Sequence, residues 1–420
     1  MTHAPFPPDF LQSDRWDWHI ASPEVAEAVR RLTLTDDCLV KSTAVRTVYR
    51  CGDYHLKFER APSLLGRFRN RLHPKAGEEY AIGQALAEAG VPSVECLGWG
   101  KLGGTNVLIT RTLPGAVSFD EYFYTHVVCG GEDPEPLLAE VTAFLNRFFE
   151  AGFLHGDLHF GNVLYQPDTH TMAWVDLISI SHKGALTDAE RRAMCRCVVT
   201  LRDGLTPERM LRLIRDVGAA KTDEEAEKFY FDELARTSRH LAETWGKRRS
   251  QILGGYSKFT DILPCPGNPM KTILLRKDWL SRPLIAKNAI ADGLPAGYER
   301  FFYKYSVPVE LPEPETELEA ELAERLFLTS MCLQILRVRH RRVAAFIRPN
   351  ELWLEPLPDG LAPVEENAPG LDFYTKELHT MGIEVRRLAD LRRLPDGSFY
   401  LPLVVNGDAT PVFMGGQFDV

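Results

Sequence analysis

The feature that most constrains the fold of this chain is an apolar segment that carries a carboxylate and, five residues later, a carboxamide. The segment reads Leu154-His155-Gly156-Asp157-Leu158-His159-Phe160-Gly161-Asn162-Val163-Leu164. A hydroxyl nucleophile needs a carboxylate that orients it and accepts its proton, while nucleotide phosphates need a metal held by nearby oxygen atoms. The spacing therefore predicts a phosphoryl-transfer loop in which Asp157 is the base and Asn162 is a metal ligand.

The segments on both sides of this loop support the interpretation. Upstream, residues 135–152 place apolar side chains on one helical face and end at Gly152, as expected for an amphipathic helix. Downstream, the turn-rich residues 166–169 precede an apolar strand that ends at Asp176. Helix, loop, hairpin and carboxylate follow one another in the order that this chemistry requires, so Asp176 is the candidate second metal ligand.

A strand pair and a helix that precede the loop carry a candidate ion pair. Residues 46–59 alternate in polarity around the turn Cys51-Gly52-Asp53, which predicts a hairpin with Lys57 facing the nucleotide cleft. A helix follows from about Gly77 to Ala89, with Ile82, Leu86 and Ala89 on its apolar face, and stops at Gly90-Val91-Pro92. Glu79 lies in its first turn and can pair with Lys57.

Each of these residues also has a purely structural interpretation. Lys57 taken alone would be a solvated strand lysine, and Asp157 and Asn162 could shape a turn. Their joint occurrence with Glu79 and Asp176 favours the functional interpretation. The four-residue spacing of His155 and His159 occurs in zinc helices, but the intervening glycine and the missing glutamate argue against zinc, so His155 is expected to brace the loop.

Composition indicates a folded enzyme of two or three compact units, because 420 residues exceed one ordinary domain. The eight cysteines are scattered without a Cys-x-x-Cys pair, as expected for reduced thiols of a cytoplasmic protein. The N-terminal segment does not have the pattern of a secretory signal, and no stretch is long and apolar enough to suggest a membrane span. The net charge of −9 argues against a general nucleic-acid binder.

A basic stretch between the lysine strand and the glutamate helix stands out against this acidic background. In residues 64–75 the arginines Arg67, Arg69 and Arg71 alternate with large apolar residues. One hypothesis is that a peripheral enzyme uses this segment to contact the anionic inner face of the cell membrane. The alternative is a solvated basic insertion that packs its apolar residues on the core.

The motifs together resemble the protein-kinase-like superfamily, and within it most closely the lipopolysaccharide core kinases that act on Kdo and heptose. The similar residues cover roughly the first 250 positions and comprise Thr47-Val48-Tyr49-Arg50, Leu56-Lys57, Glu79-Tyr80, Ala89-Gly90-Val91-Pro92, His155-x-Asp157-Leu158, Asn162-Val163-Leu164 and Asp176. The resemblance implies that Lys57 contacts the ATP phosphates, that Glu79 orients Lys57, and that Asn162 and Asp176 hold Mg²⁺. It also implies an adenine hinge from Thr110 to Leu113, with Leu164 beneath the base.

Two departures from the kinase pattern matter. Residues 41–47, at the position of the glycine-rich loop, contain no glycine, so Ser42, Thr43 or Arg46 is expected to contact phosphate instead. Asp176 is followed by Leu177-Ile178 in place of phenylalanine and glycine, which the lipopolysaccharide branch tolerates and which argues against a regulated protein kinase.

The resemblance implies an α+β, two-lobed fold with a C-terminal α/β extension. The expected parts are a lead segment (1–36), a small lobe (37–113), a large lobe (114–250) and an extension of unknown role (251–420). Helices are predicted near residues 188–201, 207–217, 223–245 and 317–347, the last with a basic end at residues 337–342 that could face anionic sugar phosphates. Residues 371–385 repeat the helix-glycine-strand pattern of residues 79–94, and a strand pair around Pro395-Asp396-Gly397 would complete a degenerate second small lobe. The favoured interpretation of the extension is an appended substrate-recognition or interaction region.

The sequence and the resemblance thus predict an ATP- and Mg²⁺-dependent phosphotransferase that acts on a sugar hydroxyl, and the expected acceptor is lipopolysaccharide core. The expected partners are ATP and a sugar or glycolipid acceptor, with no nucleic acid, and the expected location is cytoplasmic with peripheral membrane contact. One alternative is a soluble small-molecule kinase of the aminoglycoside or choline type, whose loops resemble His-Gly-Asp-Leu-His-x-Gly-Asn. A non-catalytic kinase-like scaffold is a further alternative.

Overall fold

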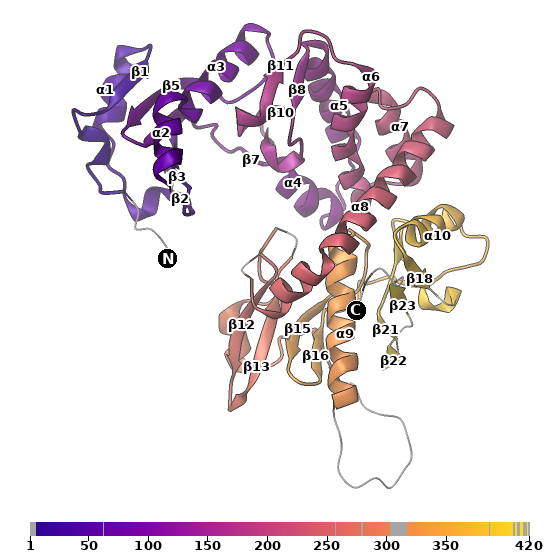
Figure 1. Cartoon of the computed structure of the whole chain (residues 1–420). Coiled ribbons are helices and arrows are strands. Elements are labelled where there is room, and N and C mark those ends of the chain that lie inside the picture. The colour runs from indigo at the N-terminus through magenta and orange to yellow at the C-terminus, as the bar shows by residue number, and fades with distance from the viewer. Residues whose placement is uncertain are drawn as a thin grey trace. The chain divides into compact units, whose positions relative to one another are not determined.

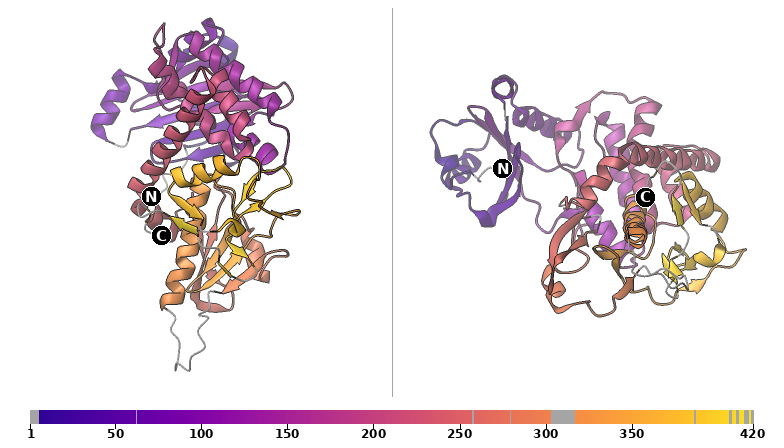
Figure 2. Two further views of the ribbon diagram at one scale, coloured as in Figure 1. Left: turned by 90° about the vertical axis from the view of Figure 1, so that its right-hand side faces the viewer. Right: turned by 60° about the horizontal axis from the view of Figure 1, so that its bottom comes forward.

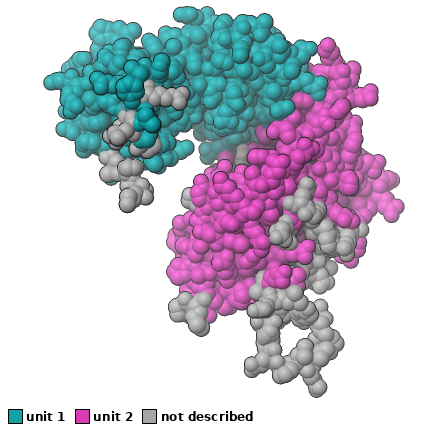
Figure 3. Space-filling model, in the orientation of Figure 1, with its two compact units in different colours: residues 1–197, 216–219 teal, residues 198–215, 220–420 magenta. Residues whose placement is uncertain are grey.

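The structure is a computed structural model that describes residues 6–61, 63–256, 258–278, 280–302, 317–385, 387–405, 408–409, 412–414 and 418. It is an α+β protein with antiparallel sheets, as the sequence predicts. The chain forms two compact units, which Figure 3 distinguishes by colour. Unit 1 comprises residues 1–197 and 216–219, and unit 2 comprises residues 198–215 and 220–420. Within the described ranges, every helix is too short or too polar to cross a lipid bilayer.

Unit 1 begins with a six-stranded antiparallel sheet in the order β1-β5-β6-β4-β3-β2. Its strands are β1 (Asp17–Ile20), β2 (Leu39–Ser42), β3 (Arg46–Cys51), β4 (Tyr54–Arg60), β5 (Cys96–Leu102) and β6 (Thr105–Arg111). The β3–β4 hairpin turns where the sequence predicts. One face of β4 buries Leu56 and Phe58 in an apolar core, so the alternate residue Lys57 points to the opposite face.

The lead segment is part of this sheet. Strand β1 pairs with β5, and helix α1 (Pro23–Arg31) follows it. Trp16, Val25 and Val29 lie in the same buried cluster as Leu56 and Phe58. Residues 6–36, which the sequence analysis describes as a lead segment, therefore contribute to the core under the sheet.

Helix α3 (Lys75–Glu88) packs against β5 and β6. Its buried positions are Ala76, Glu79, Gly83 and Leu86, which share one face at helical spacing. A side chain at position 83 would overlap the sulfur of Cys96, so glycine lets the helix approach the sheet closely. The apolar face predicted from sequence is partly wrong, because Ala89 is exposed. The buried face of α3 instead includes the charged residue Glu79.

The remainder of unit 1 is mainly helical and holds the loop at residues 154–164. Its elements, labelled in part in Figure 1, are β7 (Val117–Ser118), α4 (Phe119–Tyr122), a π-helical turn (Phe123–Val128), α5 (Glu135–Glu150), β8 (Phe153–His155), β9 (Val163–Gln166), β10 (Thr171–Trp174), β11 (Ile180–His182) and α6 (Asp188–Cys195). Strands β10-β9-β7 form one small sheet and β11-β8 another. The predicted apolar face of α5 is confirmed, since Leu138, Val141, Leu145 and Phe148 are all buried.

Unit 2 contains the long helix α8 (Asp223–Leu253) and a five-stranded sheet in the order β12-β13-β15-β16-β14. Helix α9 (Glu317–Ile335) packs along β15 and β16, which the two views of Figure 2 also show. The other elements are α7 (Pro207–Asp216, whose last residue falls in unit 1), β12 (Thr260–Cys265), β13 (Asn268–Arg276), β14 (Glu299–Phe302), β15 (Val343–Ile347), β16 (Glu351–Leu354), β17 (Ala362–Pro363), α10 (Leu371–Thr380), β18 (Ile383–Val385), β19 (Arg392–Arg393), β20 (Phe399–Tyr400), β21 (Val404–Val405), β22 (Asp408–Ala409) and β23 (Val412–Met414).

The units do not follow the residue-250 boundary that the sequence suggested, because α8 clusters with unit 2. Its buried face packs against α10 through Tyr230, Phe231 and Phe373. The Tyr230 hydroxyl also donates to the Glu377 carboxylate of α10. A helical pattern shows that an apolar face exists but does not identify the surface that covers it.

The helix predicted over residues 317–347 is wrong in its second half. Helix α9 ends at Ile335, Arg337 adopts a positive φ of 51°, and residues 343–347 form the buried strand β15. Periodicity alone does not separate a short buried strand from a continuing helix. The basic run is also committed to internal pairs, with Arg341 bonded to Glu299 and Arg342 bonded to Glu355.

The predicted helix and strand near residues 371–385 and the strand pair around residue 396 are present as α10, β18 and β19–β20. They do not join one sheet as the corresponding elements of unit 1 do. Strand β18 pairs with β23, whereas β19 and β20 lie with β17. The described part of this region therefore does not reproduce the small-lobe arrangement.

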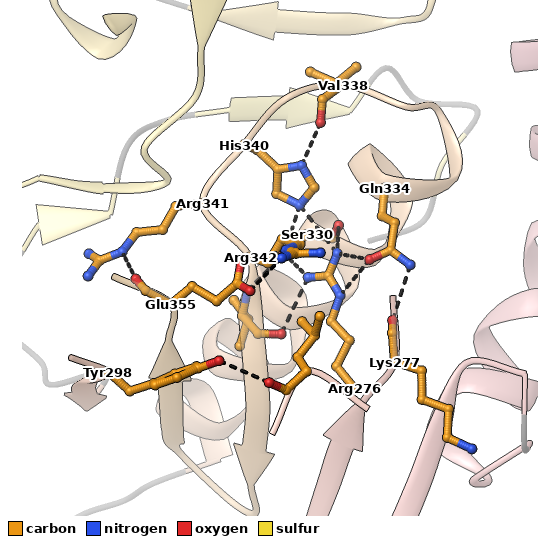
Figure 4. Close-up of polar contacts among 12 residues, drawn as sticks. Arg276, Lys277, Tyr298, Ser330, Gln334, Val338, His340, Arg341, Arg342 and Glu355 are labelled. Atoms are coloured by element: carbon orange, nitrogen blue, oxygen red, sulfur yellow. Dashed lines mark hydrogen bonds and ion pairs between the residues drawn. The ribbon is translucent and has the colours of Figure 1, made fainter. Parts of the chain in front are cut away.

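A buried polar cluster joins β13, α9 and β15 inside unit 2 (Figure 4). Arg276 is fully buried and donates to the Gln334 side chain at 2.6 Å and 3.0 Å. It also donates to Ser330, both at the hydroxyl and at the carbonyl, and to the Val343 carbonyl at 3.3 Å. His340 accepts or donates at Ser330 through Nε2 at 3.1 Å. One guanidinium thus holds the helix against two strands.

Replacement of Arg276 by leucine is expected to destabilise this part of unit 2 by about 3 kcal/mol, because it leaves several buried acceptors without their donor. Hydrogen exchange at α9 and β15 should then be about a hundredfold faster. Lys228→Ala removes an exposed pair with Asp232 on α8 and should change local stability by less than about 0.5 kcal/mol. Equal exchange rates in Arg276→Leu and the wild type would show that Arg276 does not hold α9 against β13 and β15.

Candidate active site

The predicted ion pair between Lys57 and Glu79 is present. The Lys57 ammonium on β4 lies 2.9 Å and 2.8 Å from the two carboxylate oxygens of Glu79 on α3. Glu79 Oε1 also accepts from the backbone N–H of Leu177 at 3.0 Å. Burial raises the pKa of Glu79, and the Lys57 ammonium opposes that rise. Strand, helix and the segment after β10 therefore meet at one carboxylate.

Asp176 joins this network from the end of β10. Lys57 Nζ lies 2.6 Å from Asp176 Oδ1, and Arg46 Nη1 lies 3.0 Å from Asp176 Oδ2. Burial acts to raise the Asp176 pKa, but the Lys57 and Arg46 cations outweigh it, so the net pKa is below the usual value. The backbone of Asp176 has φ 55° and ψ 54°, a left-handed conformation that few non-glycine residues adopt.

Arg46 is held in place by its cross-strand neighbour. The register of the β3–β4 hairpin sets Arg46 opposite Glu59. Arg46 Nε donates to Glu59 Oε1 at 2.6 Å, and Glu59 is buried. The Arg46 guanidinium therefore bridges two carboxylates. One is Glu59 on the neighbouring strand β4, and the other is Asp176, which follows strand β10.

The loop that carries Asp157 and Asn162 is braced by short-range hydrogen bonds. Asn162 Nδ2 donates to the Asp157 carbonyl at 3.1 Å, which leaves the carboxamide oxygen available as a ligand. The Asn162 carbonyl accepts from Val175 N–H at 3.0 Å, which ties the loop to the residue before Asp176. Asp157 itself is exposed. Because Val175 directly precedes Asp176, this backbone hydrogen bond links the two predicted metal ligands, Asn162 and Asp176.

His155 lies under this loop as a buried residue. Its Nδ1 accepts from the backbone N–H of Asp157 at 3.1 Å, and its ring contacts Trp174. Its own backbone N–H points to the sulfur of Met194 on α6 at 3.3 Å. Burial lowers the His155 pKa to about 4, so the imidazole is neutral near pH 7. These contacts fit the bracing role that the sequence predicts.

The β2–β3 turn, at the place of the glycine-rich loop, is fixed by Thr43. The Thr43 N–H donates to the Arg46 carbonyl at 2.7 Å, and the Thr43 carbonyl accepts from Arg60 at 3.0 Å. Ser42 Oγ lies 3.4 Å from Thr47 Oγ1. Ser42 and Thr43 are exposed, and their predicted contact with phosphate stays a prediction.

The predicted adenine-binding residues also lie near one another along the backbone. Thr110 is in β6, opposite His55 of β4, and Leu113 follows that strand. Strand β7 pairs with β9 so that Ser118 lies opposite Leu164. Gln166 Nε2 donates to the Pro114 carbonyl at 3.0 Å. The predicted hinge segment and the Leu164 strand are thus joined, and their contact with adenine stays a prediction.

Two residues of this network were missed by the sequence reasoning. Glu59 pairs with Arg46, and Arg60 donates to Thr47 Oγ1 at 2.9 Å as well as to Thr43. The hairpin turn alone gives the register and so sets Glu59 opposite Arg46, which is a signal that could have found the first pair. The contact of Arg46 with Asp176 spans 130 positions and has no such local signal.

The available ligands suit a hard divalent cation bound together with nucleotide phosphates. Asp176 supplies an ionised carboxylate and Asn162 a carboxamide oxygen, and Mg²⁺ favours such oxygen ligands with few protein groups. Among the residues that the structure describes, no group of three or more His, Cys, Asp or Glu side chains is placed to hold a metal. The oxygen atoms of Asp176 and Asn162 therefore fit Mg²⁺ as a donor set, and their binding of this ion stays a prediction.

Comparison with known proteins identifies the class. Residues 25–196 match the family described as Lipopolysaccharide kinase (Kdo/WaaP) family. Among solved structures, WaaP in complex with acyl carrier protein matches with 18% identity and a TM-score of 0.34, over 51% of this chain and 88% of that one. No curated protein matches the sequence. The chain is therefore a kinase. The resemblance seen in the sequence is confirmed, because residues 25–196 match the model of the lipopolysaccharide kinase (Kdo/WaaP) family.

The buried His155 predicts a defined response to acid. Because its folded-state pKa of about 4 lies below the ordinary value, the unfolded chain takes up a proton first as the pH falls below about 6.5. His155 should therefore lower stability by about 2 kcal/mol between pH 7 and pH 5. The imidazole resonance, assigned by its loss in His155→Gln, should titrate near pH 4 by NMR. A midpoint near the ordinary value would contradict this burial effect.

Proposed function

We propose that this kinase transfers the γ-phosphate of ATP to a sugar hydroxyl, and that the acceptor is the core region of lipopolysaccharide. The observation that carries the proposal is the network in which Lys57 contacts both Glu79 and Asp176 at 2.6–2.9 Å. A lysine fixed between two carboxylates from distant segments is the arrangement that phosphoryl transfer uses to position nucleotide phosphates. The family match over residues 25–196 supports the choice of acceptor.

The roles follow from position and charge. Asp157 is exposed at the loop, where it can reach an acceptor hydroxyl, orient it and accept its proton. Lys57, oriented by Glu79, contacts the ATP phosphates, which carry the charge that its ammonium complements. Asn162 and Asp176 would hold Mg²⁺, which neutralises phosphate charge when bound.

Nucleotide binding is assigned to the turn and hinge segments. Arg46 already lies 3.0 Å from Asp176, so its guanidinium is close to the place where the metal-bound phosphates would lie. Ser42 and Thr43 are exposed in the neighbouring turn and can donate to phosphate oxygens. Residues 110–113, including Thr110 and Leu113, would contact the adenine edge, with Leu164 against its face.

The acceptor and location rest on the family more than on the site. A fold of this kind serves many acceptors, so a soluble small molecule of the aminoglycoside or choline type is the second candidate. A lipopolysaccharide acceptor would place the enzyme as a peripheral protein at the inner face of the cell membrane. The non-catalytic scaffold is disfavoured because Lys57, Glu79 and Asp176 are assembled.

Asp157→Asn is expected to reduce transfer of labelled γ-phosphate from ATP to purified lipopolysaccharide by about 10²–10⁴-fold, because the amide cannot accept the hydroxyl proton. The matched control is Asp168→Asn, an exposed carboxylate in the β9–β10 turn, which should keep wild-type activity. Full activity of Asp157→Asn would remove Asp157 as the base. If lipopolysaccharide accepts no phosphate while ATP binding depends on Lys57, the acceptor is a soluble molecule.

Asp176→Asn is expected to weaken divalent cation binding by roughly tenfold or more, because it removes the ionised ligand. Mn²⁺ titration by electron paramagnetic resonance, with a non-hydrolysable ATP analogue present, measures this without turnover. The variant Asp120→Asn, outside the proposed ligand pair, serves as the control. Unchanged Mn²⁺ affinity in Asp176→Asn would show that the metal lies elsewhere.

A further inference from the structure

Helix α2 (Leu64–Leu72, labelled in Figure 1) exposes a stripe of large apolar side chains. The exposed fractions are 85% for Leu65, 64% for Phe68 and 60% for Leu72. These positions follow one another at i, i+3 and i+7, so they share one face of the helix. Single exposed apolar residues are common on protein surfaces, but several exposed together on one element indicate a contact surface.

The opposite side of α2 is the one that meets the protein. Gly66 sits against Ala61 and Ser63, where a side chain would come within 3.0 Å of both. Asn70 reaches to 3.5 Å from the Gly104 carbonyl in the β5–β6 turn, and α2 packs on β6. The amphipathic orientation is therefore inverted, with small and polar residues inward and leucine and phenylalanine outward. The predicted alternative, in which the apolar residues pack on the core, is wrong for Leu65, Phe68 and Leu72.

The charge of α2 indicates what covers this stripe. The helix contains Arg67, Arg69 and Arg71 and no acidic residue, in a chain with a net charge of −9. By helical spacing, positions 67 and 71 flank one side of the stripe and position 69 flanks the other. An apolar stripe between cationic flanks is the pattern of helices that lie in the interface of an anionic bilayer.

A second copy of this chain fits the stripe poorly. Pairing α2 with itself would bring six arginines together without an acidic partner on the helix. A stable protein interface also buries about 800 Å² per partner, which exceeds what one face of a nine-residue helix offers. A bilayer needs only a few inserted side chains together with basic residues near its surface.

We propose that α2 is an interfacial docking helix that inserts Leu65, Phe68 and Leu72 among the lipids of an anionic bilayer, with its arginines at the head groups. This deepens the peripheral location proposed above by naming the surface and the lipid charge. It does not rest on the phosphotransfer chemistry. Because α2 contains none of the proposed catalytic or nucleotide-binding residues, ATP binding and membrane binding should be separable.

The test is co-sedimentation of the full chain with vesicles of phosphatidylglycerol and phosphatidylcholine in equal amounts, and with phosphatidylcholine alone. Wild type should bind the anionic vesicles, and binding should weaken at high salt. Arg67→Gln, Arg69→Gln and Arg71→Gln combined should reduce affinity by about a hundredfold, since each basic residue contributes about fivefold near an anionic surface. Leu65→Gln, Phe68→Gln and Leu72→Gln combined should abolish binding to the anionic vesicles.

The matched control replaces exposed apolar residues of unit 2, as Tyr256→Gln, Ile262→Gln and Leu357→Gln combined, and should bind vesicles as the wild type does. All variants should bind a fluorescent ATP analogue with wild-type affinity, which shows that the small-lobe sheet and α3 remain folded. Wild-type chain that stays in the supernatant, or α2 variants that sediment like the wild type, would overturn the proposal. A concentration-dependent dimer that the leucine and phenylalanine replacements dissolve would overturn it in favour of a second copy.

Discussion

The contact of one ammonium with two carboxylates is the interaction on which the organisation of unit 1 depends. Lys57 lies on a central strand, Glu79 lies on the helix that packs on the sheet, and Asp176 follows a hairpin, 119 positions after Lys57. Removing such charges from water costs several kcal/mol per ion, and only close geometry with further hydrogen bonds offsets it. Leu177 N–H and Arg46 supply those bonds, so strand, helix and hairpin must all be in place before the network is favourable.

The sequence predicted the elements of this network because each one is specified locally. Alternation around a tight turn identifies β3 and β4, and a helical repeat between stop signals identifies α3 and α5. The Lys57–Glu79 pair follows from these elements once a kinase-like order is assumed. The bridge from Arg46 to Asp176 does not, because its position depends on how a sheet and a distant hairpin pack, which no short-range pattern encodes. The position of Glu59 opposite Arg46 can be predicted from the sequence, because the hairpin turn sets the register of the two strands.

Several helices predicted beyond about residue 200 are present, but other predictions for this part of the chain failed for a related reason. Residues 343–347 are apolar in a way that fits either a helix or a buried strand, and the choice is made by pairing with β13 and β16. The sequence suggests that the basic residues before them face anionic sugar phosphates, yet Arg341 and Arg342 form internal pairs with glutamates of other segments. Helix α8 is predicted from its sequence, but its packing partner α10 is not, because α10 lies more than a hundred residues downstream. The type of α8 and α10 follows from local sequence, whereas the type of residues 343–347 and the packing partners of all three segments depend on distant parts of the chain.

The position of α2 follows from the same division between local and long-range constraints. The chain leaves the Lys57 strand at Arg60 and enters the Glu79 helix at Lys75, and α2 occupies the connection between them. Helix α3 is fixed by the buried ion pair and by packing on β5 and β6, so the connection is not needed to hold the helix in place. Such a segment can carry exposed Leu65 and Phe68 without disturbing the site. Because α2 still packs on β6 through its small and polar face, a bilayer bound to its outer face would hold the whole sheet at the membrane surface.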